Sequence, residues 1–358
     1  MALSLGGCPV MQPTDMPPNN NAAPNLDKDG NFSFATATEL DLSSDSLRFR
    51  GRIEGDTDAD LFSIGSLNAG DRLRIDVERL DGNLDAVAAV FDADENLLSY
   101  NDDRAADNSN RDPLIDFVLP GDGSREIIFG IVNFSGSGTS GNYEVLVTIT
   151  RGEGAPDPRG QVVFLDYRGG TNIQIPQVGV FDLLPFDAAD FGPTFRSRTA
   201  EIKDNIEAIV KDRYVEFNLL LLNSDDHPKP AVPHSTIYFG ESDARAFAIS
   251  EQIDTLNQDL EDDAIVFTES YRDAFSGTPT VAEISNAVGN TVAHEIGHLL
   301  GLVHTADCGE LMDATCGNDR ILSKQTFGTA RLDTFVFPVG NQDALLLLEW
   351  VLGLAGLG

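Results

Sequence analysis

The first two fifths of the chain consist of short runs in which apolar and polar residues alternate, separated by turns rich in Gly, Asp and Asn. Leu73–Val77 and Tyr143–Val147 alternate in this way, which is typical of strands with one buried face. Ala86–Phe91 and Glu126–Val132 are almost wholly apolar, which predicts strands buried on both faces. Residues 31–151 are therefore predicted to form an all-β sandwich.

The pattern changes after residues 152–160, a stretch with two prolines and three glycines that predicts a linker. Beyond it, Gln161–Leu165 and Val215–Leu222 predict buried strands, and Phe195–Asp212 predicts an amphipathic helix. Residues 161–358 are thus predicted to form a second, mixed α/β domain. Further strands are expected at Ser235–Phe239, Ala246–Ile249 and Ala264–Phe267.

A long helix is predicted from Thr280 to about Leu300. Thr280 and Glu283 have the spacing of a capping box, in which the first and fourth residues satisfy each other's free backbone donors. The apolar run 345–352 contains Glu349 and is too short to span a membrane, so it predicts a packed terminal helix.

With 358 residues, the chain is long enough for two domains that each bury a core. Its formal charge of −34 would repel phosphate backbones, so nucleic acid is not expected as a partner. Acidic surfaces also suit Ca²⁺. The sequence leaves open whether the acidic clusters bind this ion or are simply solvated loops.

Three of the five histidines lie close together on or just after the long helix. His294 and His298 are four residues apart, so their imidazoles lie one helical turn from each other and can bind one metal ion. Glu295 can reach a zinc-bound water without being a ligand, as a general base requires. Gly301 can end the helix in a left-handed conformation, which would bring His304 to the same ion.

The run from His294 through Gly301 to His304 resembles the extended zinc motif of the metzincin peptidases. The resemblance implies a mixed sheet with a long active-site helix, one catalytic Zn²⁺, and protein or peptide substrates. Around Met312, the sequence Glu-Leu-Met-Asp resembles the methionine turn that lies beneath the metal in this family. The threonine at position 305, directly after the third histidine, resembles pappalysin-like enzymes at that position. The compact turn around Met312 resembles that of matrixins instead. By the same resemblance, the strand near Ala246–Ile249 is expected at the sheet edge, where an extended substrate would pair with it.

The acidic run Gly55–Ile64, followed by Asp92–Asn96, resembles the bacterial pre-peptidase C-terminal domain. That resemblance implies a jelly-roll-like β-sandwich of the kind that accompanies secreted peptidases. In that family the module more often follows the peptidase, whereas here it precedes the predicted metal motif.

Cys308 and Cys316 flank the predicted methionine turn and are expected to form a disulfide in an oxidising compartment, with two free thiols as the alternative. Cys8 follows Leu-Gly-Gly, which resembles the lipobox of bacterial lipoproteins. Either Cys8 is lipidated and tethers the protein to a membrane, or the match is accidental. Residues 1–30 are accordingly interpreted as a lipoprotein signal remnant and a disordered tether.

These features predict an exported, zinc-dependent endopeptidase, either secreted or anchored to a bacterial cell envelope. The alternative is a surface-anchored binding protein whose zinc domain is inactive. Because an inactive domain has no need of a carboxylate beside the metal, Glu295 favours the peptidase.

Overall fold

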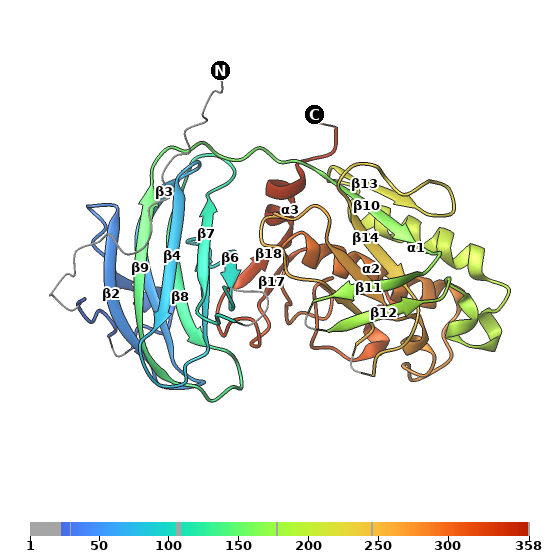
Figure 1. Ribbon diagram of the computed structural model, residues 1–358, viewed down its shortest axis with the longest axis horizontal. Helices are drawn as coiled ribbons and strands as arrows, with labels where there is room; N and C mark the ends of the chain where they lie inside the picture. The colour runs from blue at the N-terminus through green and yellow to red at the C-terminus, as the bar shows by residue number, and fades with distance from the viewer. Residues whose placement is uncertain (1–22, 29, 105–108, 177, 245, 357–358) are drawn as a thin grey trace, which may run out of the picture.

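The computed structural model describes residues 23–28, 30–104, 109–176, 178–244 and 246–356, which form two lobes joined by an extended linker (Figure 1). The structure is mostly β, with several sheets and few helices. Cys8 lies outside the described residues. Within the predicted tether, Pro24 and Leu26 hydrogen-bond to the backbone of Arg50, so this part of it lies along the first lobe.

The first lobe is a sandwich of two sheets with strand orders β1-β3-β8-β5-β6 and β2-β9-β4-β7. All strand pairs are antiparallel except β1 with β3. The strands are β1 (Thr38–Glu39), β2 (Ser46–Ile53), β3 (Ala59–Asn68), β4 (Arg72–Arg79), β5 (Ala86–Phe91), β6 (Leu97–Asn101), β7 (Leu114–Val118), β8 (Ser124–Asn133) and β9 (Gly141–Thr150), with a 3₁₀ turn η1 (Phe34–Thr36) before them.

Burial along these strands follows the sequence pattern. Strand β9 alternates between buried and partly buried residues, because one of its faces covers the core. Strand β5 is buried at every position. Ala88 and Val90 face the core of the sandwich, whereas Val87, Ala89 and Phe91 belong to a cluster shared with the second lobe. The sandwich therefore uses the outer face of its five-stranded sheet as a contact surface.

The second lobe has a five-stranded mixed sheet of order β13-β10-β14-β16-β15, in which only the edge strand β15 is antiparallel. Helices α1 and α2 pack together so closely that a Cβ on Gly289 would lie 2.7 Å from Ile209. The elements are β10 (Gln161–Asp166), β11 (Gly170–Ile175), β12 (Gly179–Leu183), η2 (Ala188–Phe191), η3 (Pro193–Phe195), α1 (Thr199–Arg213), β13 (Leu219–Asn223), β14 (Ser235–Phe239), β15 (Ala248–Ser250), β16 (Asp263–Val266), η4 (Thr268–Tyr271), α2 (Val281–Leu299), η5 (Asn318–Leu322), β17 (Thr329–Arg331), β18 (Asn341–Asp343) and α3 (Ala344–Leu352).

Several predicted boundaries differ from the structure. The strand expected at Val215–Leu222 begins only at Leu219, because Val215 is exposed and Phe217 pairs with Leu354 near the C-terminus instead. The helix expected from Phe195 begins at Thr199, after a separate 3₁₀ turn. The hairpins β11–β12 and β17–β18 were not predicted. None of the described helices is both long enough and apolar enough to cross a bilayer.

Candidate metal centre

Helix α2 carries two of the three clustered histidines and has the predicted capping box. The Thr280 backbone N–H donates to the Glu283 carboxylate at 2.7 Å, and the Glu283 N–H donates to the Thr280 hydroxyl at 3.3 Å. At the other end, Gly301 has φ +95°, as predicted. The N–H of Leu302 donates to the Gly297 carbonyl at 2.8 Å, a bond characteristic of a Schellman motif. The chain is thereby turned back toward the helix.

This turn brings the third histidine to the first two. One ring nitrogen from each of His294, His298 and His304 lies within 4.8 Å of the others. The Nε2 atoms of His298 and His304 are 3.1 Å apart. Two nitrogens bound to one tetrahedral zinc ion at about 2.0 Å would lie roughly 3.3 Å apart. The spacing therefore suits a shared zinc ion.

Backbone carbonyls determine which nitrogen of each helical histidine carries the proton. The Nδ1 atom of His294 lies 2.9 Å from the Leu311 oxygen, and that of His298 lies 2.8 Å from the Leu302 oxygen. Because a carbonyl oxygen only accepts hydrogen bonds, both Nδ1 atoms must be protonated, and each Nε2 keeps its lone pair. These rings thus present unprotonated nitrogens, as metal ligands must.

Burial keeps all three rings neutral. It lowers the pKa of His294 to about 3, and a positive charge on His304 would lower it further. Burial also lowers the pKa of His298 and His304. Neutral imidazoles are the form that binds zinc, so the donor set fits this ion in chemistry as well as in spacing.

The Glu295 carboxyl group is buried beside the histidines. It is 6% exposed, and the Ser250 hydroxyl at the end of β15 acts against the effect of burial on its pKa. Burial raises its pKa to about 8 when no cation is near. A dication at the three histidines would favour the carboxylate and oppose this shift.

Met312 lies fully buried under the C-terminal end of α2, where its sulfur is 2.7 Å from the position of a Cβ added to Gly297. The turn is held by the buried Glu310, whose carboxylate accepts bonds from the Thr305 hydroxyl and the Met312 N–H, both at 2.7 Å. This role of Glu310 was not predicted, although the residue lies only two positions before the methionine.

The predicted disulfide between Cys308 and Cys316 is present, with their Cα atoms 5.5 Å apart. These two sulfurs also lie close to the Asp313 carboxylate, but oxidised sulfurs are not thiolate ligands. In the described part of the chain, no three acidic side chains converge in the way the histidines do, so the possibility of a Ca²⁺ site finds no support.

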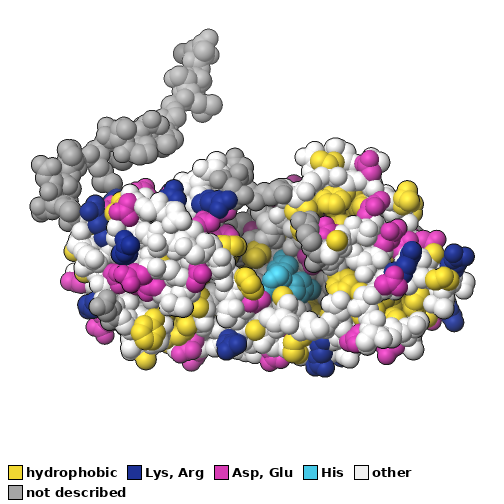
Figure 2. Space-filling model, turned by 90° about the horizontal axis from the view of Figure 1, so that it is seen from below, with side chains coloured by type: hydrophobic (Ala, Val, Ile, Leu, Met, Phe, Trp, Pro, Cys, Tyr) yellow, Lys and Arg dark blue, Asp and Glu magenta, His cyan; other side chains and the backbone are white. Residues whose placement is uncertain are grey.

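A cavity of about 320 Å³ opens beside the histidines. Figure 2 shows histidine side chains at the floor of a hollow near the middle of the molecule. The cavity is lined by the segment 246–248, by Leu311 and Asp313, and by His294 and Glu295. The edge position expected for the strand near Ala246–Ile249 is thus confirmed, with the strand itself at Ala248–Ser250.

The other two histidines lie away from this centre. His234 is buried and its Nδ1 contacts the Val232 carbonyl at 2.7 Å, while His227 is exposed on a loop. Neither borders the cavity.

Residues 58–124 match the bacterial pre-peptidase C-terminal domain family, which confirms the resemblance of the sandwich to this domain over that range. No curated protein matches the chain. Among solved structures, the pre-peptidase C-terminal domain of a collagenase from Bacillus anthracis is 14% identical, with 36% of this chain and 100% of that chain covered and a TM-score of 0.22.

Two peptidase structures resemble the chain weakly. Archaemetzincin from Methanopyrus kandleri is 13% identical, with 47% of this chain and 87% of that chain covered and a TM-score of 0.27. A zinc-dependent peptidase from Methanocorpusculum labreanum is 15% identical, with 46% and 94% covered and the same TM-score of 0.27. Structural similarity at this level does not support an argument about function, which depends on the geometry of the histidines.

Proposed function

We propose that this protein is a zinc-dependent endopeptidase of the metzincin type, in which His294, His298 and His304 hold the ion and Glu295 is the general base. The observation that carries this proposal is the convergence of three neutral imidazoles, two of which have their Nδ1 protons committed to backbone carbonyls. A buried carboxyl group on the same helix and an adjoining cavity support it.

When bound, zinc would supply Lewis acidity for the scissile carbonyl and lower the pKa of a water molecule. Glu295 accepts the proton of the attacking water and then delivers it to the leaving nitrogen of the peptide. Burial raises its pKa, but a dication at the histidines would act against that rise and keep the carboxylate ionised and able to accept a proton.

The edge of the sheet favours peptides as the substrate class. Strand β15 pairs with β16 on one side only, and the segment that leads into it borders the cavity. An extended peptide can add to such an edge through backbone hydrogen bonds, which do not depend on its sequence. Its scissile bond would then lie near Glu295.

An exported location fits the sandwich and the disulfide. Pre-peptidase C-terminal domains are typical of secreted bacterial proteins, and disulfides persist in oxidising compartments. We propose that the protein acts outside the cytoplasm. Attachment to a membrane through a lipid on Cys8 belongs to the same proposal.

The test is cleavage of a mixed peptide library, with zinc measured in the same samples. Glu295→Gln should retain zinc and lose cleavage by about 100-fold or more. His304→Ala should lose both, and Glu349→Gln on the exposed face of α3 should change neither. If wild type binds zinc but cleaves no peptide that Glu295→Gln leaves intact, the result favours the alternative, a surface-anchored binding protein with an inactive zinc domain.

A further inference from the structure

The N-terminal sandwich is connected to the third histidine through strand β18. The backbone N–H of Asn341 donates to the Glu95 carbonyl, in the turn between β5 and β6, at 2.8 Å. The next residue, Gln342, is fully buried and turns its carboxamide to the backbone of Val303. The Val303 N–H donates to Gln342 Oε1 at 2.7 Å, and Gln342 Nε2 donates to the Val303 carbonyl at 3.0 Å. Val303 immediately precedes His304.

The same segment holds the other side of His304. The N–H of Asp333 donates to the His304 carbonyl at 3.1 Å, and Leu332 forms an antiparallel bridge with Thr305. The backbone on both sides of the third histidine is therefore bound by residues 332–342, which also contact the sandwich. His294 and His298 differ in this respect, because helix α2 itself fixes their positions.

Apolar contacts join this segment firmly to the sandwich. Phe337 is 1% exposed, and its ring centroid lies 5.3 Å from that of Phe91 on β5. A Cβ on Gly130 of β8 would come within 2.7 Å of the Phe337 ring, so the ring lies directly on the sheet. Val303 and Leu332 belong to the same buried cluster as these sandwich residues.

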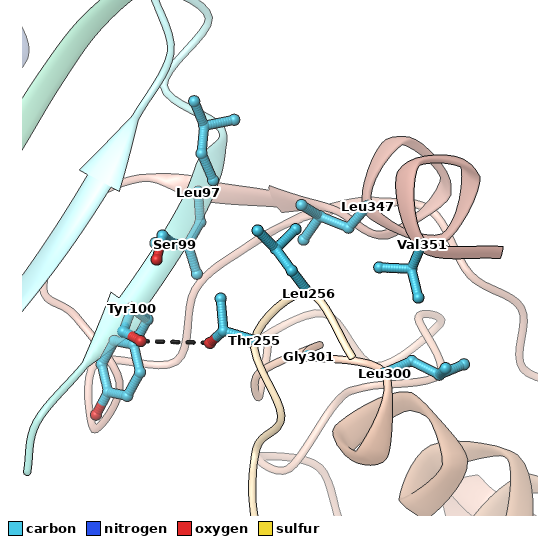
Figure 3. A pocket seen from close by; sticks show the side chains of 10 residues that line it. Leu97, Ser99, Tyr100, Thr255, Leu256, Leu300, Gly301, Leu347 and Val351 are labelled. Carbon is cyan, nitrogen blue, oxygen red and sulfur yellow. Dashed lines mark hydrogen bonds between the residues drawn. The ribbon is translucent and has the colours of Figure 1, made fainter. Parts of the chain in front are cut away.

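A second contact reaches the end of helix α2. The Thr255 hydroxyl donates to the Tyr100 carbonyl on β6 at 3.3 Å (Figure 3). The neighbouring Asp254 N–H donates to the His298 carbonyl at 3.0 Å. Leu256, Leu300 and the sandwich residues Leu97–Tyr100 line one cavity of only about 10 Å³, which is about the least volume that can hold one water molecule. The boundary between the lobes is therefore filled by side chains at this point.

We propose that the sandwich is a structural part of the metal site, and that Gln342 is the positioning residue through which it fixes His304. This proposal rests on the proposed function, since it assumes that the three histidines bind zinc. His304 follows the helix-ending Gly301 and has no regular secondary structure to hold it. Without Gln342, two buried backbone groups of Val303 would lose their partners, and the chain would move to satisfy them.

The experiment compares Gln342→Met with wild type in the full chain. Co²⁺ and Zn²⁺ affinities are measured by competition with a chromophoric chelator, and the visible spectrum of the Co²⁺ form reports ligand geometry. We expect metal binding about 10- to 100-fold weaker and an altered Co²⁺ spectrum, as for the loss of other groups that orient a metal ligand. Asn223→Leu is the matched control, because Asn223 is a buried amide that bonds to Glu207 and Asp226 and not to the metal-binding turn.

Each outcome decides one part of the proposal. If wild type binds neither metal, the proposed function fails. If wild type binds and Gln342→Met binds equally tightly with the same spectrum, the role of Gln342 is refuted. Should that variant not fold, Gln342→Glu carries the same comparison, since it keeps the acceptor for the Val303 N–H. Phe337→Leu loosens the contact with the sandwich while keeping Gln342, and an unchanged Co²⁺ affinity in it would refute the role of the sandwich.

Discussion

Replacing Asp60 by asparagine is expected to remove a pH dependence of stability that this buried carboxyl group confers on the sandwich. Asp60 is 1% exposed on β3 and accepts a hydrogen bond from the Tyr143 hydroxyl at 2.6 Å. Burial raises its pKa from the ordinary 3.8 to about 8, although the Tyr143 bond acts in the opposite direction. The carboxyl group is therefore protonated in the folded protein at neutral pH, with Asp27 near enough to accept its proton in a hydrogen bond.

The sign follows from where the proton is held. Between the two pKa values the folded chain binds a proton that the unfolded chain has released, so stability falls as pH rises. Each pH unit in this window lowers the free energy of unfolding by about 1.4 kcal/mol, and a rise from about pH 5 to about pH 7 lowers it by about 2.7 kcal/mol. The asparagine of the variant cannot titrate, and its amide can donate where the carboxylic proton did.

The assay is urea unfolding of wild type and Asp60→Asn at three pH values in this window. The difference between their unfolding free energies should grow in favour of the variant by about 2.7 kcal/mol over two pH units. Asp71→Asn is a control of opposite sign. Burial acts to raise the pKa of Asp71, but bonds from Asn68, Arg151 and Gly152 outweigh it and lower the pKa. Parallel pH profiles for wild type and Asp60→Asn would refute the reasoning.

Three further changes test other parts of the fold. Thr280→Ala removes the cap of α2 and should lower the free energy of unfolding by about 1 kcal/mol, measured in urea; no change would mean that the helix does not depend on this cap. Gly301→Ala places a Cβ 2.8 Å from the Asp254 carbonyl oxygen, at a residue with φ +95°. It should lower the free energy of unfolding by more than about 1 kcal/mol and weaken Zn²⁺ binding, measured by competition with a chelator. Wild-type values for both quantities would contradict the geometry of the turn. Replacing both Cys308 and Cys316 by serine opens a loop with a sequence separation of 8 and should lower stability by about 2.5 kcal/mol, whereas equal unfolding midpoints would show that the bridge adds nothing.

Local patterns account for what could be predicted. Strand β14 has the predicted bounds, and α2 begins where its capping box places it, because both depend on neighbouring residues. The four-residue spacing of His294 and His298 likewise needs only helical geometry. The role of Gly301 could be predicted because few residues other than glycine adopt a positive φ readily.

The partners of the site could not be predicted in this way. Gln342 is 39 residues from Val303 in sequence, and it belongs to a strand of three residues that shows no periodicity. In the sequence, Glu310 cannot be told from any other acidic loop residue, because its hydrogen bond from the Thr305 hydroxyl depends on the fold. Each of these contacts is decided by how distant segments pack, which a local pattern does not record.

The sequence of strand β5 reflects the contact of the sandwich with the second lobe. Its six apolar residues correctly predicted burial on both faces. The run alone did not show what covers the outer face. In a free sandwich the outer face would meet water, and the strand would alternate as β9 does. Here Val87, Ala89 and Phe91 cover the second lobe. The apolar outer face is therefore a property of the sandwich sequence itself, so this module carries in its own strands the surface that braces the turn around His304.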